Sequence, residues 1–226
     1  MESLEDRIWS RMEKGRLSWI LAFFIVSYYI YVCQWAIFWG PSPKVLHRIG
    51  ALNAAKIDDG EIWRLSASLI MHGDVIHLSF NILALIALVR IGEAIYGGIR
   101  VVCILYISGL VGALFSWSMG AVRTVGASGA IFGLLAALCV GAWKYRYSLD
   151  GELGDILRKR LIFWGLVNLL LGLLIPNIDN PSHFGGVIGG ILLGMLLNNQ
   201  WEGGGDKVFL GLLATAALLL GLSTIS

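Results

Sequence analysis

The stretch Gly126-Ala127-Ser128-Gly129-Ala130-Ile131-Phe132-Gly133 places a serine between glycines where a short apolar segment begins. A nucleophilic serine needs a close approach, an exposed hydroxyl and nearby backbone N–H donors. A glycine-flanked serine at the start of a helix can provide all three. The same pattern inside an apolar run also serves close helix packing alone. The stretch therefore predicts a helix start in an apolar protein, and leaves open whether Ser128 reacts or only packs.

The composition indicates a membrane protein. Of the 226 residues, 57% are hydrophobic and only 14% are charged, and the mean hydropathy is +0.76. A soluble domain carries roughly 25% charged residues. We therefore expect an all-α polytopic membrane protein with the bilayer as its main solvent. The three cysteines fall in apolar segments without the spacing of a disulfide framework or a metal site, and no cofactor is expected.

Seven apolar segments follow a polar start. We divide the chain into a cytoplasmic N-terminal segment (1–16), a six-helix core (17–197), and a linker with a seventh transmembrane helix (198–226). Segment four is short: its sixteen residues span about 24 Å, less than the ~30 Å hydrocarbon core. Residues 120–127 should then enter the membrane as non-helical backbone. The seven segments are 17–39, 75–91, 101–119, 128–143, 161–175, 183–197 and 208–225.

The basic residues predict the orientation. With seven spans, twelve lysines and arginines fall on the side of the N-terminus and five on the other side. The positive-inside rule then places the N-terminus in the cytoplasm, and we expect a multi-pass protein of a bacterial inner membrane. The basic run Arg158-Lys159-Arg160 is interpreted as an orientation and lipid-contact signal, so no nucleic-acid partner is expected.

Polar residues converge at one depth. Segments two, four and six all enter from the outer side, and their first residues include His77, Asn81, Ser128 and His183. Polar side chains inside spans are costly and by default indicate function. Three separate segments bring them to the same end of the bundle, so the topology itself predicts a site there.

Glycine spacing suggests how two of these residues meet. Small residues at every fourth position form a flat helix face that allows backbones to approach closely. Ser128 and His183 begin two such faces, so packing them would bring the hydroxyl and the imidazole within hydrogen-bond reach. The two faces carry Gly129 and Gly133 in segment four, and Gly186, Gly190 and Gly194 in segment six.

These residues suggest acyl-transfer chemistry. His183 can accept the Ser128 proton as general base. The developing oxyanion would be stabilised by the Ser128 N–H and by side-chain donors from Asn81 and His77. Asp179 is interpreted as a loop or capping residue, and no carboxylate is evident within the spans. The sequence therefore predicts a Ser–His dyad.

A metal site is the weaker interpretation of the histidines. His72, His77 and His183 could form a three-histidine set, but the chain has no His-Glu-x-x-His motif and no acidic partner in the spans. No metal is therefore expected. His72 is instead expected to hydrogen-bond the loop above the site.

At this point the sequence resembles the rhomboid family of intramembrane serine proteases, from roughly Glu61 to Gly194. The shared motifs occur in the family's order and in the right segments. They are Trp63-Arg64, His72, His77-Leu-Ser-Phe-Asn81, Glu93-x-x-x-Gly97, Tyr106-Ile107-Ser108-Gly109, Gly126-Ala127-Ser128-Gly129 and His183-Phe-Gly-Gly186-x-x-x-Gly190.

The resemblance implies a six-helix core with Ser128 as nucleophile and His183 as base, and His77, Asn81 and the Ser128 amide around the oxyanion. It implies cleavage of transmembrane protein substrates near the outer end of their helix. It also implies a membrane-lying first loop (40–74) and lateral substrate entry beside Phe163 and Trp164.

Two features depart from the family pattern. Phe132 stands where many members carry a tyrosine stacked on the catalytic histidine, so stacking can persist without the hydroxyl. The seventh helix occurs in only part of the family.

Two other classes of function stay open at this stage. A catalytically silent binding protein could escort membrane proteins without cutting them, but inactive relatives usually lack the serine or the histidine. A small transporter is less favoured, because transporters often show broken helices in repeated halves and no such repeat is seen.

Overall fold

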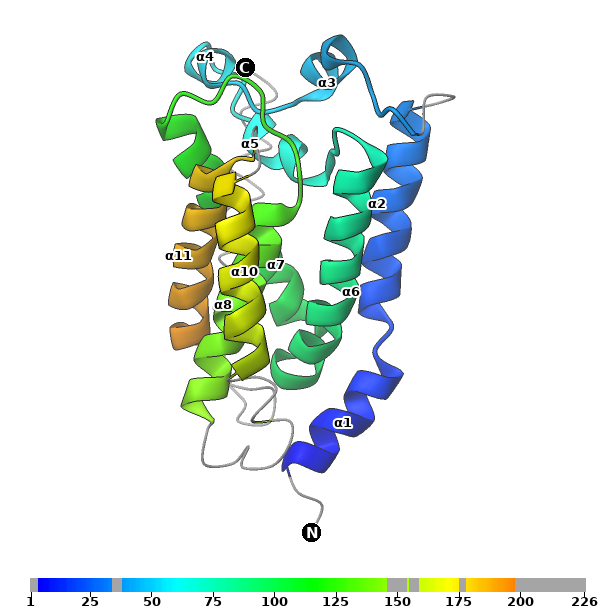
Figure 1. Cartoon of the computed structure of the whole chain (residues 1–226), viewed down its shortest axis with the longest axis vertical. Helices are drawn as coiled ribbons and strands as arrows, with labels where there is room; N and C mark the ends of the chain where they lie inside the picture. The colour runs from blue at the N-terminus through cyan, green and yellow to red at the C-terminus, as the bar shows by residue number, and fades with distance from the viewer. Residues whose placement is uncertain (1–3, 34–37, 146–153, 155–158, 175–177, 198–226) are drawn as a thin grey trace.

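The computed structural model describes residues 4–33, 38–145, 154, 159–174 and 178–197. Within these ranges the chain forms helices and no strand, and long helices pack side by side as a bundle (Figure 1). The helices are α1 (Leu4–Lys14), α2 (Leu17–Cys33), α3 (Pro43–Ile49), α4 (Ala54–Asp58), α5 (Arg64–Ala67), the 3₁₀ helix η1 (Ser68–Ile70), α6 (Val75–Tyr96), α7 (Gly98–Ser118), α8 (Ser128–Lys144), α10 (Leu161–Leu174) and α11 (Asn180–Leu196).

The prediction of an all-α polytopic membrane protein is confirmed. Three helical stretches, Ile8–Cys33, Val75–Tyr96 and Gly98–Ser118, are long and apolar enough to cross a bilayer, and α8 is a shorter apolar helix. Residues 119–127 before α8 are non-helical, as its short length predicts. The predicted seventh helix (208–225) lies outside the described residues.

Helix α6 is longer than the apolar run predicts. It continues past residue 91 to Tyr96 and ends at Gly97, whose φ of 85° lies in the left-handed region that favours glycine. Arg90 lies within the helix, and its Nε donates to the Met12 carbonyl oxygen of α1 (3.1 Å). The residues beyond 91 stay helical because Ala94, Ile95 and Tyr96 are buried in the bundle.

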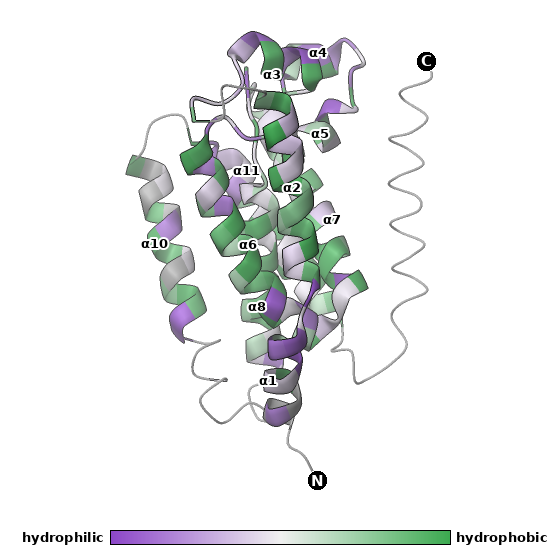
Figure 2. Cartoon of the chain, turned by 90° about the vertical axis from the view of Figure 1, so that its right-hand side faces the viewer, coloured by the Kyte–Doolittle hydropathy of each residue, from purple (hydrophilic) through white to green (hydrophobic). Residues whose placement is uncertain are grey.

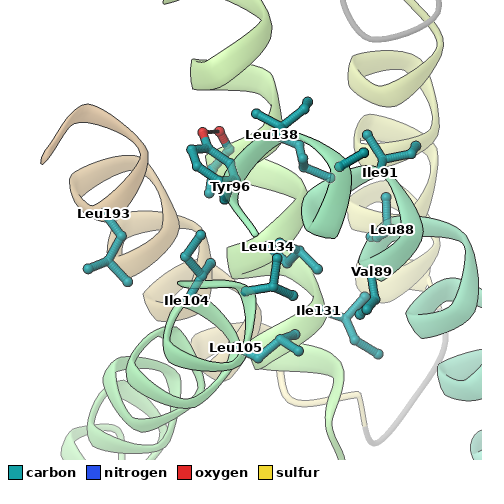
Figure 3. Close-up of a cluster of buried hydrophobic side chains, with 14 of the residues drawn as sticks. Leu88, Val89, Ile91, Tyr96, Ile104, Leu105, Ile131, Leu134, Leu138 and Leu193 are labelled. Carbon is teal, nitrogen blue, oxygen red and sulfur yellow. Dashed lines mark hydrogen bonds between the residues drawn. The ribbon is translucent and has the colours of Figure 1, made fainter. Parts of the chain in front are cut away.

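The central core lies between α6, α7, α8 and α11 (Figure 3). Tyr96 reaches across it, and its hydroxyl donates to the Ala137 carbonyl oxygen (2.7 Å). Helix α10 packs beside α8 and α11 at one edge of the bundle (Figure 2). The core side chains shown include Leu88, Val89, Ile91, Ile104, Leu105, Ile131, Leu134, Leu138 and Leu193.

Helices α8 and α11 touch through glycines. A side-chain carbon on Gly186 would overlap the carbonyl oxygen of Gly129, and one on Gly190 would overlap the carbonyl oxygen of Gly133. At Gly194 it would lie 2.9 Å from Val140 Cβ. We call this contact the glycine seam. It confirms that the glycine faces meet at backbone distance, which only residues without a side chain allow.

The polar helices cap the two ends of the bundle (Figures 1 and 2). Helices α3, α4 and α5 lie at the end opposite α1. Helix α1 packs against α6, and its Ile8 is only 2% exposed within the central core. The N-terminal segment thus packs partly against the bundle, where the sequence indicated only a surface position.

The first loop (40–74) folds around Arg64, which is 4% exposed. Its guanidinium donates to the carbonyl oxygens of His47 (2.7 Å) and Ala51 (3.0 Å) and to the Glu61 carboxylate (2.8 Å). The bond from Arg64 to the Glu61 carboxylate lowers the pKa of that carboxyl. The loop is therefore held by one cation that satisfies two of its carbonyl groups.

Candidate active site

Ser128 and His183 lie within hydrogen-bond distance. His183 Nε2 is 2.8 Å from Ser128 Oγ. Ser128 is the first residue of α8, and His183 lies in the first turn of α11 and is 6% exposed. The structure thus brings together the two residues that the glycine faces place near each other, at the end of the glycine seam.

The start of α11 is fixed by its cap and by its contact with α8. Pro181 occupies the first turn, and Asp179 Oδ1 accepts the Ser182 N–H (3.0 Å). A side-chain carbon on Gly129 would lie 2.6 Å from Ser182 Oγ, so this glycine admits Ser182 beside the nucleophile. Asp179 therefore caps the helix, as the sequence suggested, and its carboxylate oxygens bind Ser182 and Ser116.

Phe132 lies on the imidazole of His183. The two ring centroids are 4.4 Å apart and the planes are 28° apart, which is a stacked arrangement. Phe132 sits one helical turn after Ser128 on α8, so a single helix carries both the hydroxyl and the ring that supports the base. The stacking expected from the resemblance is therefore present without a tyrosine hydroxyl.

His77 approaches the loop that precedes Ser128. Gly126 has φ of 134°, and a side-chain carbon there would lie 2.8 Å from Cε1 and Nε2 of His77. The backbone conformation and the close ring both require glycine at this position. The Gly126 N–H donates to the Ser68 carbonyl oxygen (3.0 Å). His77 is thus placed beside the nucleophile loop, here defined as residues 119–127.

Asn81 lies one turn further along α6 and is 6% exposed. Its Nδ2 donates to the His77 carbonyl oxygen (3.0 Å). An amide nitrogen carries two hydrogens, so this bond to its own helix orients the group and leaves a second N–H. The structure places His77 and Asn81 on the side of the site that the sequence indicated.

His72 packs against His77 and is 2% exposed. The two rings meet edge to face at 5.1 Å. Within the described residues neither ring nitrogen of His72 has a hydrogen-bond partner of normal geometry, although the Ile70 backbone of the loop is close enough to raise the pKa of the imidazole. The expected bond to the loop stays a prediction. Burial, with a smaller contribution from the adjacent His77, lowers the pKa of His72 from 6.5 to about 3. His72 is therefore a neutral packing partner.

The histidines do not assemble as the alternative metal site would require. Within the described residues, no three His, Cys, Asp or Glu side chains gather in a group that could hold a metal ion. His72 and His77 pair with each other, and His183 pairs with Ser128.

Sequence reasoning missed a polar connection between α7, α11 and the nucleophile loop. Ser116 Oγ binds the Asp179 carboxylate and lies 3.4 Å from Thr124 Oγ1. Thr124 also exchanges both backbone hydrogen bonds with Leu52 of the first loop (2.9 and 3.0 Å). Ser116 lies within the apolar segment 101–119, and no pattern in the sequence indicates its partners.

The chain is thus a polytopic membrane protein in which a serine and a histidine pair at the starts of two packed helices. The family model of the Rhomboid domain matches residues 59–200, and the chain belongs to the rhomboid family. Three relatives come from a plant, a bacterium and a parasite, and the chain spans about half or less of their length.

These three relatives share between 29% and 36% identity with this chain. RHOMBOID-like protein 5 of Arabidopsis thaliana is 36% identical over 161 residues, covering 70% of this chain and 51% of the relative. Rhomboid protease GluP of Bacillus subtilis is 34% identical over 178 residues, covering 79% and 34%. Rhomboid-like protease 5 of Toxoplasma gondii is 29% identical over 183 residues, covering 76% and 21%. At the level of the family, these relatives support intramembrane proteolysis.

Proposed function

We propose that this protein is an intramembrane serine endopeptidase that uses Ser128 as nucleophile and His183 as general base. The observation that carries the proposal is the 2.8 Å contact between Ser128 Oγ and His183 Nε2 at the ends of two helices in backbone contact. A hydroxyl needs an adjacent base to attack a peptide carbonyl at neutral pH.

The chemistry proceeds in two halves. His183 Nε2 takes the Ser128 proton as Oγ bonds to the carbonyl carbon, and the resulting imidazolium returns that proton to the leaving amine nitrogen. The C–N bond breaks and leaves an acyl-enzyme ester. A water molecule, deprotonated by the same imidazole, attacks the ester, and the Ser128 oxygen takes the proton back.

The tetrahedral intermediates carry an oxyanion that needs donors. The Ser128 N–H is available because the first N–H groups of a helix lack intrahelical partners. Asn81, through its second amide hydrogen, and His77, beside Gly126, are the proposed side-chain donors. Such donors, fixed before reaction, stabilise charge as it develops.

The proposed substrates are transmembrane segments of other membrane proteins, which reach the site within the bilayer. We propose the N-terminus in the cytoplasm and the site opening to the outer side, because twelve of the seventeen lysines and arginines fall on the N-terminal side. Lateral entry beside α10 stays a prediction, as does a bacterial inner membrane.

A fluorophosphonate probe tests the proposal in detergent-solubilised protein. The wild type should be labelled at Ser128, Ser128→Ala should not be labelled, and His183→Ala should be labelled far more slowly. A reporter with one transmembrane segment should be cleaved by the wild type alone. A wild-type chain that binds such a segment but neither cleaves it nor takes the label would instead be an escort protein.

A further inference from the structure

Asp179 makes two bonds with its two carboxylate oxygens. Oδ1 accepts the Ser182 N–H at the start of α11, and Oδ2 accepts the hydroxyl of Ser116 from the last turn of α7. A capping residue needs only the first bond. The second joins the start of α11, four residues before His183, to a different helix.

The direction of the hydrogen bonds follows from chemistry. Ser116 has one hydroxyl proton, and an ionised carboxylate can only accept. Ser116 therefore gives its proton to Asp179, and its oxygen lies 3.4 Å from Thr124 Oγ1. Ser116 is fully buried, so water does not compete for these groups, and bonds to a charged acceptor are the stronger kind.

Thr124 lies in the nucleophile loop, four residues before Ser128. Its backbone is fixed by the exchange of hydrogen bonds with Leu52, and the next turn is fixed by Gly126 N–H to Ser68. The Thr124 side chain is thus the point at which this loop meets the Ser116–Asp179 pair.

We propose that Asp179 is a positioning residue for the reaction: through Ser116 and Thr124 it holds the helix that carries His183 in register with the nucleophile loop, which leads directly into Ser128. The inference rests on the proposed function. The glycine seam sets how closely α8 and α11 approach, whereas the Asp179 chain fixes their starting residues at the end where the hydroxyl and the imidazole meet.

A purely structural cap gives a different expectation. If Asp179 only caps α11, then Ser116→Ala and Thr124→Val leave turnover unchanged, because neither touches the Ser182 N–H. Thr124→Val keeps the shape of the side chain and both backbone bonds to Leu52, and it removes only the hydroxyl. Ser118→Ala is the matched control, since this exposed serine on α7 donates to the Phe115 carbonyl oxygen of its own helix.

The experiment measures kcat and KM for the reporter, the rate of fluorophosphonate labelling of Ser128, and the Tm in detergent. We expect Ser116→Ala, Thr124→Val and Asp179→Ala each to lower kcat and the labelling rate by about tenfold, less than the ~10²-fold cost of a 1 Å misplacement. KM should stay within about twofold, because the affected groups hold the reacting pair and do not bind the substrate. The double variant Ser116→Ala/Asp179→Ala should lose no more than Asp179→Ala alone, because the two residues act as one unit.

The conservative variant Asp179→Asn provides a rescue. Its oxygen can cap Ser182 and its Nδ2 can donate to Ser116, so it should recover most of the kcat lost in Asp179→Ala. Full kcat in both Ser116→Ala and Thr124→Val overturns the inference, as does a loss of kcat that merely follows Tm. If the wild type is neither labelled nor active, the proposed function fails and the positioning role fails with it. If the wild type is active and the Ser116→Ala and Thr124→Val variants are equally active, only the positioning role fails.

Discussion

A side-chain carbon on Gly190 would overlap the carbonyl oxygen of Gly133. The backbones of α11 and α8 are therefore in direct contact, with no layer of side chains between them. Ser128 and His183 begin these same two helices. The distance between the hydroxyl and the imidazole is thus set by a contact that no residue other than glycine permits.

Gly190→Ala should separate the two helices. We expect the free energy of unfolding to fall by about 1–3 kcal/mol or more, as is typical of overpacking. The labelling rate of Ser128 should fall by a larger fraction than the free energy of unfolding. The measurements are Tm in detergent and fluorophosphonate labelling. Gly98→Ala is the control, because its added carbon meets Leu17 at 3.6 Å, an ordinary contact. Equal behaviour of the two variants would show that the seam tolerates side chains.

Asn81→Ala should remove an oxyanion donor. The loss of one such donor costs ~10²–10³ in rate, and the remaining donors place this variant near the lower limit. The effect should appear in kcat for the reporter. Ser79→Ala on the same helix is the control, since its exposed hydroxyl donates to the Val75 carbonyl oxygen. Unchanged turnover in Asn81→Ala would exclude the residue from the oxyanion site.

Phe132→Ala should release the ring of His183. Aromatic pairs contribute ~0.5–1.5 kcal/mol beyond burial, so we expect a severalfold loss in labelling rate together with a lower Tm. Phe132→Tyr keeps the stacked ring and should retain labelling near that of the wild type. If Phe132→Ala labels as fast as Phe132→Tyr, the stacking at 4.4 Å does not hold the base.

His72 should make the fold sensitive to mild acid. Its pKa is about 3 in the folded protein and ~6.5 when unfolded. Between these two pH values the unfolded chain therefore binds one proton more than the folded chain. Stability is complete above pH 6.5 and falls as the pH falls, by about 2 kcal/mol between pH 7.5 and 5.

Denaturant titrations at the two pH values test this expectation against His72→Asn, which lacks the titrating group. The variant should lose about 2 kcal/mol less stability than the wild type over the same pH change. The same pH dependence in both proteins would mean that other groups cause it.

Arg64→Ala should loosen the first loop. It leaves the carbonyl oxygens of His47 and Ala51 without their donor and should cost about 2–3 kcal/mol of stability, given the ~1–3 kcal/mol for an unsatisfied buried group. Thermal unfolding measures the loss. Arg64→Lys should recover only part of it, because one ammonium cannot reproduce the planar fork. Arg48→Ala, at an exposed arginine of the same loop, should leave Tm unchanged.

The bilayer explains what could be predicted from sequence. A membrane restricts the chain to helices across its core, so apolar runs placed the spans, and glycine spacing placed Ser128 against His183. The predicted segment ended at residue 91, whereas α6 continues to Tyr96 because Ala94, Ile95 and Tyr96 pack in the central core, which sequence does not reveal. The Leu52–Thr124 bridge and the bond from Ser116 to Asp179 were missed because single polar pairs between loops have no periodicity.

The 55-residue separation of Ser128 and His183 also matters while the chain is being made. At the usual rate of synthesis, roughly 3–11 s pass between the two residues. During that interval the nascent chain carries the serine without the imidazole, and α8 has no glycine face against which to pack. Under the proposed function, the newly made protein therefore cannot cleave its neighbours in the membrane until α11 has been made.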